Sequence, residues 1–399
     1  MNKFRSFWPF QRFLTMFVLA HFAHHLVNAL LIPLLPFIRN DFVLNYTQAG
    51  FVMSAFILSY GLAQWPGGWL ADHIGRHITV AIGISGSAFC GLLLGLSPSF
   101  TMMIVFLVLL GLIGGGYHPS APALVSGLVE PKNRGRALGF HLIGGSVAFV
   151  LTPLLAAVIS AVWGWRGTFI TLAVPALIFG IIFYMVLHRW GAYTRYEPTT
   201  VSSNKEVPAK LGHIRHLAPV IILITFTQAV TFSTISFIPL FIVDHFHVEE
   251  STAAASIALI WTAGLWAAPL GGYLSDRVGR LPVVLLTCLF IGPIIYLLNF
   301  VSYGFGTNAM LLAIGTLMVG RIPAAEAYII ERTSEQNRST VLGIYCTGTE
   351  NGGLLLGAVT PIMGYLIDKF SFYTSFTYAG IFLVIVTIAC SIYLWASRT

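Results

Sequence analysis

The sequence predicts an all-α integral membrane protein with twelve transmembrane helices, arranged as two pseudo-symmetric six-helix bundles. Of its 399 residues, 57% are hydrophobic and only 9% are charged, whereas a soluble domain averages about 25% charged residues. The apolar residues fall into runs of about 20 or more, the length that a helix needs to cross a bilayer. Landmark residues also recur at about half the length of the chain, which indicates an internal duplication.

The duplication is visible in one ten-residue segment that occurs twice. It reads GGWLADHIGR at Gly67–Arg76 and GGYLSDRVGR at Gly271–Arg280, 204 residues later (271 − 67). The pair Asn133-Arg134 recurs at the same offset as Asn337-Arg338. Because separate landmarks keep one spacing, we infer that a unit of roughly 200 residues was duplicated in the same direction.

The apolar runs predict where the membrane-spanning helices lie. In chain order they cover about 13–38, 46–70, 78–97, 101–128, 135–160, 167–187, 216–243, 251–274, 281–302, 307–331, 338–366 and 372–396. The one long polar stretch, 188–215, separates the sixth helix from the seventh. The predicted organisation is therefore an N-terminal six-helix bundle at 1–187, a cytoplasmic linker at 188–215 and a C-terminal six-helix bundle at 216–399.

Positive charges are distributed unevenly between the two sides of the predicted membrane. Of the 21 Lys and Arg residues, 17 lie on the side of both termini and the linker, and 3 lie on the opposite side. Because cytoplasmic loops are enriched in Lys and Arg, we expect a multi-pass protein of the cytoplasmic (inner) membrane with both termini and the linker in the cytoplasm. The net charge of +7 then reflects orientation, and the expected partner is membrane lipid and no nucleic acid.

The sequence contains no motif of a catalytic or fuel-binding site. It lacks G-x-x-x-x-G-K-[ST], G-x-S-x-G and H-E-x-x-H. Its four cysteines lie in apolar runs without a C-x-x-C pair, so neither a metal site nor a disulfide is expected. We therefore expect neither an enzyme nor an ATP-driven pump, no metal and no cofactor. What remains is a secondary transporter, a monomer that moves a small-molecule substrate with the proton gradient as its driving force.

The first predicted helix carries an unusual set of polar residues. Spacings of three and four residues put them on one helical face: His21, His24, His25 and Asn28. An offset of 206 residues (227 − 21) aligns three of these positions with threonines of the seventh helix: Thr227, Thr231 and Thr234. Gln228 adds to the second face. Ionisable groups inside a membrane are costly and mark functional sites, so these faces either line a central cavity or bond neighbouring helices.

Further polar or aromatic candidates lie in the middle of other predicted helices. They are Tyr117, His118, His141, Trp261 and Arg321 for the substrate or cavity, and His25, His118, Glu326 and Glu350 for proton coupling. A membrane-buried guanidinium needs an anion, which for Arg321 could be Glu326, Glu350 or the substrate. Both a permanent ion pair and one that substrate or proton breaks remain open. Glu331, near the cytoplasmic end, is expected to cap a helix or pair with loop charge.

The repeated segment resembles the signature loops of the major facilitator superfamily, which read G-x-x-x-D-x-x-G-R. The matching residues are Gly68, Asp72, Gly75 and Arg76 in the first copy and Gly272, Asp276, Gly279 and Arg280 in the second. The resemblance covers essentially the whole chain. It implies two bundles that rock around a central site, with the first and seventh helices flanking the cavity and the two loops latching its cytoplasmic side.

Two further stretches resemble fosmidomycin-resistance exporters within that superfamily. They are HHLVNALLIPLLPF in the first helix and YHPSAPA in the fourth. This resemblance implies proton-coupled efflux (antiport) of a small organic solute, for which an anion is one candidate. The main alternative is proton-coupled uptake of an organic anion. A third alternative is a receptor or assembly protein that no longer transports.

Overall fold

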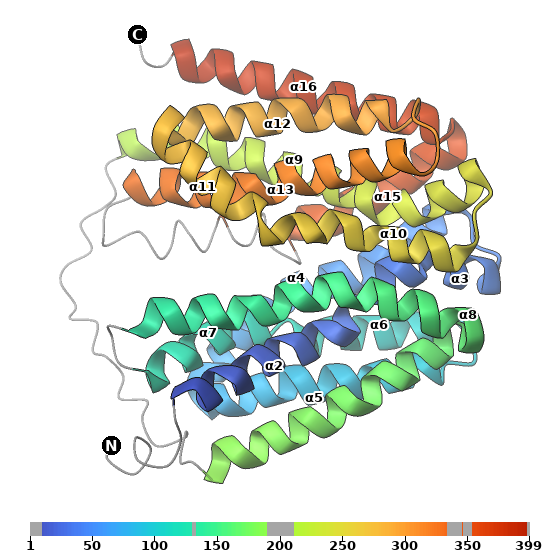
Figure 1. Ribbon diagram of the computed structural model, residues 1–399, viewed down its shortest axis with the longest axis vertical. Helices are drawn as coiled ribbons and strands as arrows, with labels where there is room; N and C mark the ends of the chain where they lie inside the picture. The colour runs from blue at the N-terminus through green and yellow to red at the C-terminus, as the bar shows by residue number, and fades with distance from the viewer. Residues whose placement is uncertain (1–9, 130–132, 190–210, 333–344, 346–352, 397–399) are drawn as a thin grey trace. The chain divides into compact units, whose positions relative to one another are not determined.

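The computed structural model describes residues 10–129, 133–189, 211–332, 345 and 353–396 (Figure 1), and within these ranges the side chains of 10–13, 134–135 and 211–216 are not described. All regular elements of the described residues are helices, and none of these residues forms a strand. The predicted all-α class is therefore confirmed. The predicted linker lies mostly outside the described residues.

The contacts of the chain divide it into two compact units. Unit 1 comprises residues 1–42 and 55–202, and unit 2 comprises residues 43–54 and 203–399. A short segment of the first half, 43–54, is thus grouped with the second half.

Unit 1 is built from long helices that are rich in apolar residues. They are α2 (Phe10–Asn28), α3 (Leu31–Phe42), α4 (Tyr46–Ile74, from residue 55), α5 (Arg76–Gly95), α6 (Phe100–Gly114), α7 (Tyr117–Leu128) and α8 (Arg134–Arg189). Helix α8 packs along α2 and α5. It contains one non-helical residue, Gly164, at φ 65°, which separates the predicted fifth and sixth helices.

Unit 2 repeats this pattern with its own set of helices. They are α9 (Leu211–Phe246), α10 (Glu250–Thr262), the 3₁₀ turn η2 (Ala263–Leu265), α11 (Ala267–Val278), α12 (Arg280–Leu297), α13 (Phe305–Glu331), α15 (Leu354–Lys369) and α16 (Phe372–Ala396). Helix α12 packs between α13 and α16, while α9 packs on α15.

Eight helical segments of the described residues are long and apolar enough to cross a membrane, or nine if the bent pair of α10 and α11 is counted as one span. These segments support an integral multi-pass membrane protein. Part of the predicted eleventh helix, 338–366, lies outside the described residues. The number of twelve spans therefore stays a prediction.

Three predicted spans are interrupted in the structure. The first is broken at 29–30 between α2 and α3, and the fourth at 115–116 between α6 and α7. The eighth bends by 41° between α10 and α11. Gly115 and Gly116 lie at the second break with right-handed helical φ values of −60° and −70°, and a Cβ atom on Gly115 would overlap the carbonyl oxygen of Tyr60. In lipid such breaks require backbone that is buried in protein or lines a watery cavity.

Corresponding glycines bring helices together in both units. A Cβ atom on Gly67 would lie 2.5 Å from the Cα atom of Gly116, and one on Gly271 would overlap the carbonyl oxygen of Gly320. Both pairs belong to the 204-residue repeat. Small residues let helices in a membrane protein approach closely, so the duplication has preserved the same backbone crossing twice.

Candidate functional site

Five histidine side chains from three helices gather inside unit 1. They are His21, His24 and His25 of α2, His118 at the start of α7 and His141 of α8. The ring of His21 stacks on that of His141 with centroids 4.3 Å apart, and the ring of His24 stacks on that of Tyr117 at 4.1 Å. The three helices thus bring together residues that the sequence singled out separately.

The backbone determines which ring nitrogen carries the proton in three of these histidines. Nδ1 of His21 lies 2.9 Å from the carbonyl oxygen of His141, and Nδ1 of His141 lies 3.0 Å from that of Phe17. Nδ1 of His24 lies 3.2 Å from the carbonyl oxygen of Gly83. A carbonyl only accepts, so each Nδ1 donates. In the neutral ring, Nε2 then presents a lone pair.

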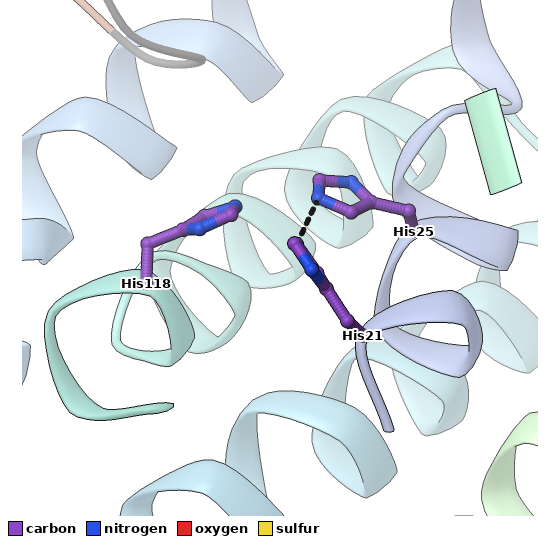
Figure 2. Close-up of side chains that lie close together, drawn as sticks. All are labelled: His21, His25 and His118. Atoms are coloured by element: carbon purple, nitrogen blue, oxygen red, sulfur yellow. Dashed lines mark hydrogen bonds between the residues drawn. The ribbon is translucent and has the colours of Figure 1, made fainter. Parts of the chain in front are cut away.

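The Nε2 atoms of the cluster differ in how well they are satisfied. His24 Nε2 accepts from the Tyr60 hydroxyl at 3.0 Å. His25 Nε2 lies 3.1 Å from His21 Nε2 and donates to it (Figure 2). His118 Nε2 is buried and has no hydrogen-bond partner among the described residues. Where the three rings meet, the Nε2 atoms of His21 and His25 thus satisfy each other, and that of His118 is left without a partner among the described residues.

Other buried polar atoms of unit 1 also lack a hydrogen-bond partner among the described residues. Asn28 Nδ2 donates to the carbonyl oxygen of His24 at 2.6 Å, but Asn28 Oδ1 has no partner. The hydroxyls of Tyr117 and Ser87 are likewise unpartnered. A Cβ atom on Gly114 would lie 2.9 Å from Ser87 Oγ and 3.0 Å from Asn28 Oδ1. Buried polar atoms are normally paired, so this region is suited to bind a polar group that the chain does not supply.

Unit 2 contains a buried positive charge, the guanidinium of Arg321 in α13. This guanidinium is 2% exposed. Its Nη2 donates to Gln228 Oε1 of α9 at 2.6 Å, and its Nη1 lies 3.7 Å from Cys288 Sγ. Its Nε is buried without a partner among the described residues. Neither Gln228 nor Cys288 carries a negative charge, so these contacts leave the buried cation in need of an anion.

Glu326 and Glu350 are the two glutamates predicted as partners of Arg321 or as proton carriers, and the structure describes the first of them. Glu326 is half-buried in α13 and is not among the hydrogen-bond partners of Arg321, which are Gln228 and Cys288. Glu350 lies outside the described residues. Of the anions expected for Arg321, Glu326 is thus not its partner in this structure, whereas Glu350 and the substrate stay predictions.

The helix that carries Gln228 also buries unpartnered hydroxyls. Thr227 and Thr231 of α9 are fully buried, and their Oγ1 atoms have no partner among the described residues. Thr234 donates to the carbonyl oxygen of Val230. The face of α9 aligned with the histidine face of α2 is therefore polar and buried. Trp261 is half-buried near the end of α10, and its role stays a prediction.

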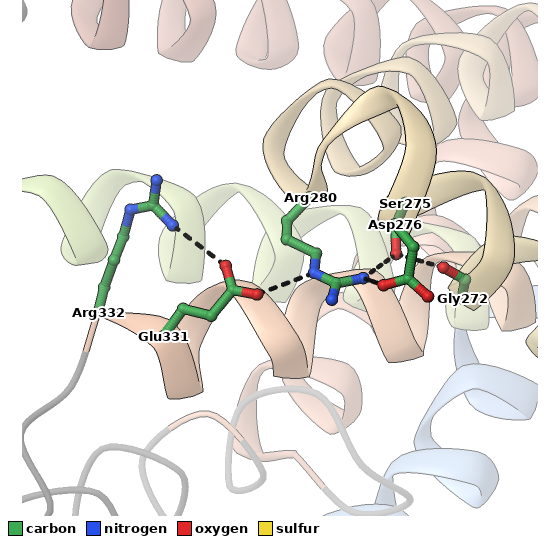
Figure 3. Close-up of polar contacts among 6 residues, drawn as sticks. All are labelled: Gly272, Ser275, Asp276, Arg280, Glu331 and Arg332. Carbon is green, nitrogen blue, oxygen red and sulfur yellow. Dashed lines mark hydrogen bonds and ion pairs between the residues drawn. The ribbon is translucent and has the colours of Figure 1, made fainter.

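The two signature loops each form an ion pair between residues four apart. In the first, Arg76 Nη2 lies 3.3 Å from Asp72 Oδ1. In the second, Arg280 pairs with Asp276, donates to Ser275 Oγ at 2.7 Å and lies 3.0 Å from Glu331 Oε1 of α13 (Figure 3). Glu331 thus pairs with loop charge, which is one of the two roles expected for it.

Sequence reasoning missed several functional candidates of the structure. The Tyr60 hydroxyl contacts His24 Nε2, and Ser87 Oγ and Asn28 Oδ1 both lie next to Gly114, but the spacing of Tyr60 and Ser87 in the sequence does not relate them to the histidine face. In unit 2, the carboxylate of Asp368 accepts from the backbone N–H groups of Tyr46 at 2.9 Å and Thr47 at 2.7 Å. Asp368 therefore caps the N-terminus of α4 from a distant part of the sequence, and such a partner leaves no local signal.

Comparisons with known proteins point to one family. The model of the Major Facilitator Superfamily matches residues 17–358 and 267–399. The hexuronate transporter of Bacillus subtilis (strain 168) is 21% identical over 367 residues, covering 88% of this chain and 85% of that protein. The multidrug resistance protein MdtG of Citrobacter koseri is 26% identical over 360 residues, covering 88% and 84%.

Solved structures of transporters share the fold over almost the whole chain. A bacterial homolog of the human lysosomal transporter Spinster, inward-facing and occupied, superposes with a TM-score of 0.76 at 18% identity and covers 98% of both chains. A POT family transporter in complex with 5-aminolevulinic acid superposes with a TM-score of 0.80 at 12% identity, covering 96% of both. At these identities the likeness concerns the fold alone.

Proposed function

This chain belongs to the Major Facilitator Superfamily, a family of membrane transporters and not of enzymes, and on that premise we propose that it transports a small organic anion by alternating access. The observation that carries the proposal is the buried Arg321, whose contacts are a neutral amide and a thiol. Leaving a buried charge unpaired is strongly unfavourable. A substrate carboxylate or phosphonate would supply the missing charge with two hydrogen bonds, a geometry that guanidinium groups favour.

Neighbouring groups of Arg321 suit an anion that also carries hydroxyls. Gln228 Oε1 already accepts from the guanidinium, which leaves the Nε2 hydrogens of Gln228 and the hydroxyls of Thr227 and Thr231 on the same helix. These groups can donate to or accept from alcohol oxygens. The hexuronate transporter of Bacillus subtilis is named for a substrate class with this combination. Polyhydroxylated carboxylates are therefore the first substrates to test.

We propose efflux as the direction, coupled to the inward movement of protons. Its support is the resemblance of the α2 and α7 segments to exporters and the similarity to the multidrug resistance protein MdtG. Proton-coupled uptake is the second candidate, supported by the similarity to the hexuronate transporter. An ion gradient is the proposed energy source because the sequence has no nucleotide-binding motif, and Glu326 is a half-buried carboxylate on the helix of Arg321. We also propose a monomer in the cytoplasmic membrane with both termini inside.

Transport assays on proteoliposomes test the anion proposal. The purified chain is reconstituted, and counterflow is measured with a panel of organic anions that includes glucuronate, with xylose and with an amphiphilic cation, all at equal concentrations. We expect counterflow of glucuronate or another organic anion, and none of xylose. Transport of the cation or neutral sugar in preference to every anion in the panel would contradict the proposal.

The direction of coupled transport needs a separate assay. Everted and right-side-out vesicles are given a pH gradient of either sign, and substrate accumulation is followed. Efflux by proton antiport predicts accumulation in everted vesicles whose interior is acidic. Accumulation in right-side-out vesicles with an alkaline interior would identify symport and uptake instead, and accumulation independent of the gradient would exclude proton coupling.

A further inference from the structure

We propose that His21, His25 and His118 form a binding site for one divalent transition-metal ion of the zinc class. The structure brings one nitrogen of each ring within 4.8 Å of the others, and Figure 2 shows the three rings converging from α2 and α7. The inference rests on this cluster alone. It does not depend on the substrate or the direction of transport.

The spacing of the nitrogens is close to that of a tetrahedral metal site. With Zn–N bonds of about 2.0–2.1 Å, two ligand nitrogens lie about 3.3 Å apart. The Nε2 atoms of His21 and His25 are 3.1 Å apart, so this pair is almost in place. The His118 ring has to swing toward the pair, and its Nε2 gives up no hydrogen bond to a described residue when it does so.

The protonation of the rings also suits metal binding. His21 donates its Nδ1–H to the carbonyl oxygen of His141, which leaves Nε2 as the ligand atom. Metal-bound histidines almost always donate the other ring N–H to a carbonyl, carboxylate or water in this way. His25 now donates from Nε2 to His21, so it would bind the ion after moving that proton to Nδ1. The exchange needs no net release of protons.

The ligand set identifies the class of ion. Three imidazole nitrogens favour Zn²⁺, Ni²⁺ or Cu²⁺, whereas Mg²⁺ and Ca²⁺ require oxygen ligands. Three protein ligands leave a fourth tetrahedral position open to water or an anion. An ion there would occupy the lone pairs of His25 and His118, so these two residues would not serve as proton carriers. The sequence alone predicted no metal, because His118 lies far along the chain from α2.

His24 provides a matched control within the same cluster. It is fully buried on the same helix, but its Nδ1 faces the carbonyl oxygen of Gly83 and its Nε2 faces the Tyr60 hydroxyl. Both of its nitrogens are therefore engaged by the protein, as expected for a histidine with a structural role. The proposal predicts that His24 is not a ligand.

Metal binding is tested on protein that is purified through an affinity tag without histidines and then stripped of metal with a chelator. Titration with Co²⁺ should produce the visible absorption bands of a tetrahedral site, saturating at one equivalent, and Zn²⁺ should displace them. H118A and H25Q should each weaken Co²⁺ binding by more than about 100-fold, since even residues that only support metal ligands contribute 10- to 100-fold. H24Q should keep one equivalent.

A second measurement keeps the proposal testable if a variant fails to fold. Zn²⁺, but not Mg²⁺, should raise the thermal unfolding midpoint of the unaltered protein, because an ion that binds only the folded state stabilises it. H118A removes a ring whose Nε2 has no partner and should abolish this shift. No Co²⁺ bands and no shift with Zn²⁺ in the unaltered protein, or undiminished binding in H118A, would overturn the proposal.

Discussion

The two units share close helix crossings and sharp turns at equivalent glycines, and they differ in the chemistry of their polar interiors. Gly67 and Gly271 make the same close helix crossing, and Gly75 and Gly279 have nearly the same φ, 106° and 104°. At the equivalent position in the repeat, however, unit 1 has Tyr117 and unit 2 has Arg321. Duplication has therefore preserved the positions where only glycine fits, while side chains at the centre have diverged.

Because of this divergence, the buried polar groups that lack partners differ in chemistry between the two units. In unit 1, neutral imidazole rings converge, and the Nε2 atom of His118 has no hydrogen-bond partner among the described residues. In unit 2, the guanidinium of Arg321 has more donors than its partner Gln228 can accept. Unit 1 is thus suited to bind a cation, and unit 2 an anion.

The first prediction concerns the anion site of unit 2. R321Q should weaken binding of the transported anion by at least about 30-fold, because truncating one member of a buried charge pair costs about 2 kcal/mol or more. Q228E should have a comparable effect for the opposite reason. It would give Arg321 a permanent carboxylate partner that competes with the substrate.

Ligand binding to both variants is measured by calorimetry or by quenching of tryptophan fluorescence. R321K keeps the charge but loses the forked donor geometry, so its affinity should fall between those of the unaltered protein and R321Q. Unchanged affinity in R321Q would show that the arginine is structural.

The second prediction concerns the glycine crossings that both units share. G271A should lower the free energy of unfolding by about 1–3 kcal/mol, the usual cost of forcing atoms into a packed interior, because its Cβ atom would overlap Gly320. G67A should be destabilised in the same direction, since its Cβ atom would lie 2.5 Å from Gly116.

Unfolding by denaturant in detergent micelles measures this effect. G264A and G127A are the matched controls, since nothing lies within 4 Å of a Cβ atom at either position. If G271A were as stable as G264A, the crossing would not be a constraint of the fold.

The third prediction concerns the cap that Asp368 provides for α4 within unit 2. D368A should cost about 0.5–2 kcal/mol of unfolding free energy, the range for losing a helix cap. D368N keeps one acceptor oxygen and should cost less. Hydrogen exchange of the backbone amides of Tyr46 and Thr47 should accelerate in D368A. Protection that persisted in this variant would mean that water replaces the carboxylate without loss.

The fourth prediction concerns the exposed ion pairs of the two loops. D72N and D276N should slow transport in proteoliposomes while leaving substrate affinity and thermal stability nearly unchanged, because exposed pairs contribute little to stability. The effect of D276N should be smaller if Glu331 continues to hold Arg280. The double variant D276N/E331Q tests this point. Unchanged transport rates in all three variants would show that these ion pairs have no role in the transport cycle.

The sequence predicted the parts of the molecule that repeat or follow a helical period. The spacing of His21, His25 and Asn28 placed them on one face, and the offset between halves related this face to Thr227 and Thr231. Helical periodicity identifies a face but not the partner that faces it. The meeting of α2 with His118 and His141, and the pairing of Arg321 with Gln228, therefore required the structure.

Other features had no local cause that sequence could display. The break at 29–30 falls inside an apolar run that reads as a continuous span, because in a membrane the neighbouring helices decide whether an interruption is tolerated. The Asp368 cap joins residues more than 300 positions apart. Which imidazole nitrogens stay unpaired depends on individual backbone carbonyls of other helices, which no spacing encodes.

The single-residue joints at Gly75 and Gly279 have a mechanical consequence. Helix α4 ends at Ile74 and α5 begins at Arg76, just as α11 ends at Val278 and α12 begins at Arg280. A joint of one residue contains no slack, and its positive φ suits only glycine. Neither helix of such a pair can slide along its axis without displacing the other, so we expect each pair to move as one rigid body. Lengthening either joint by a few residues would uncouple its two helices and would also separate the Asp and the Arg that form the ion pair across it.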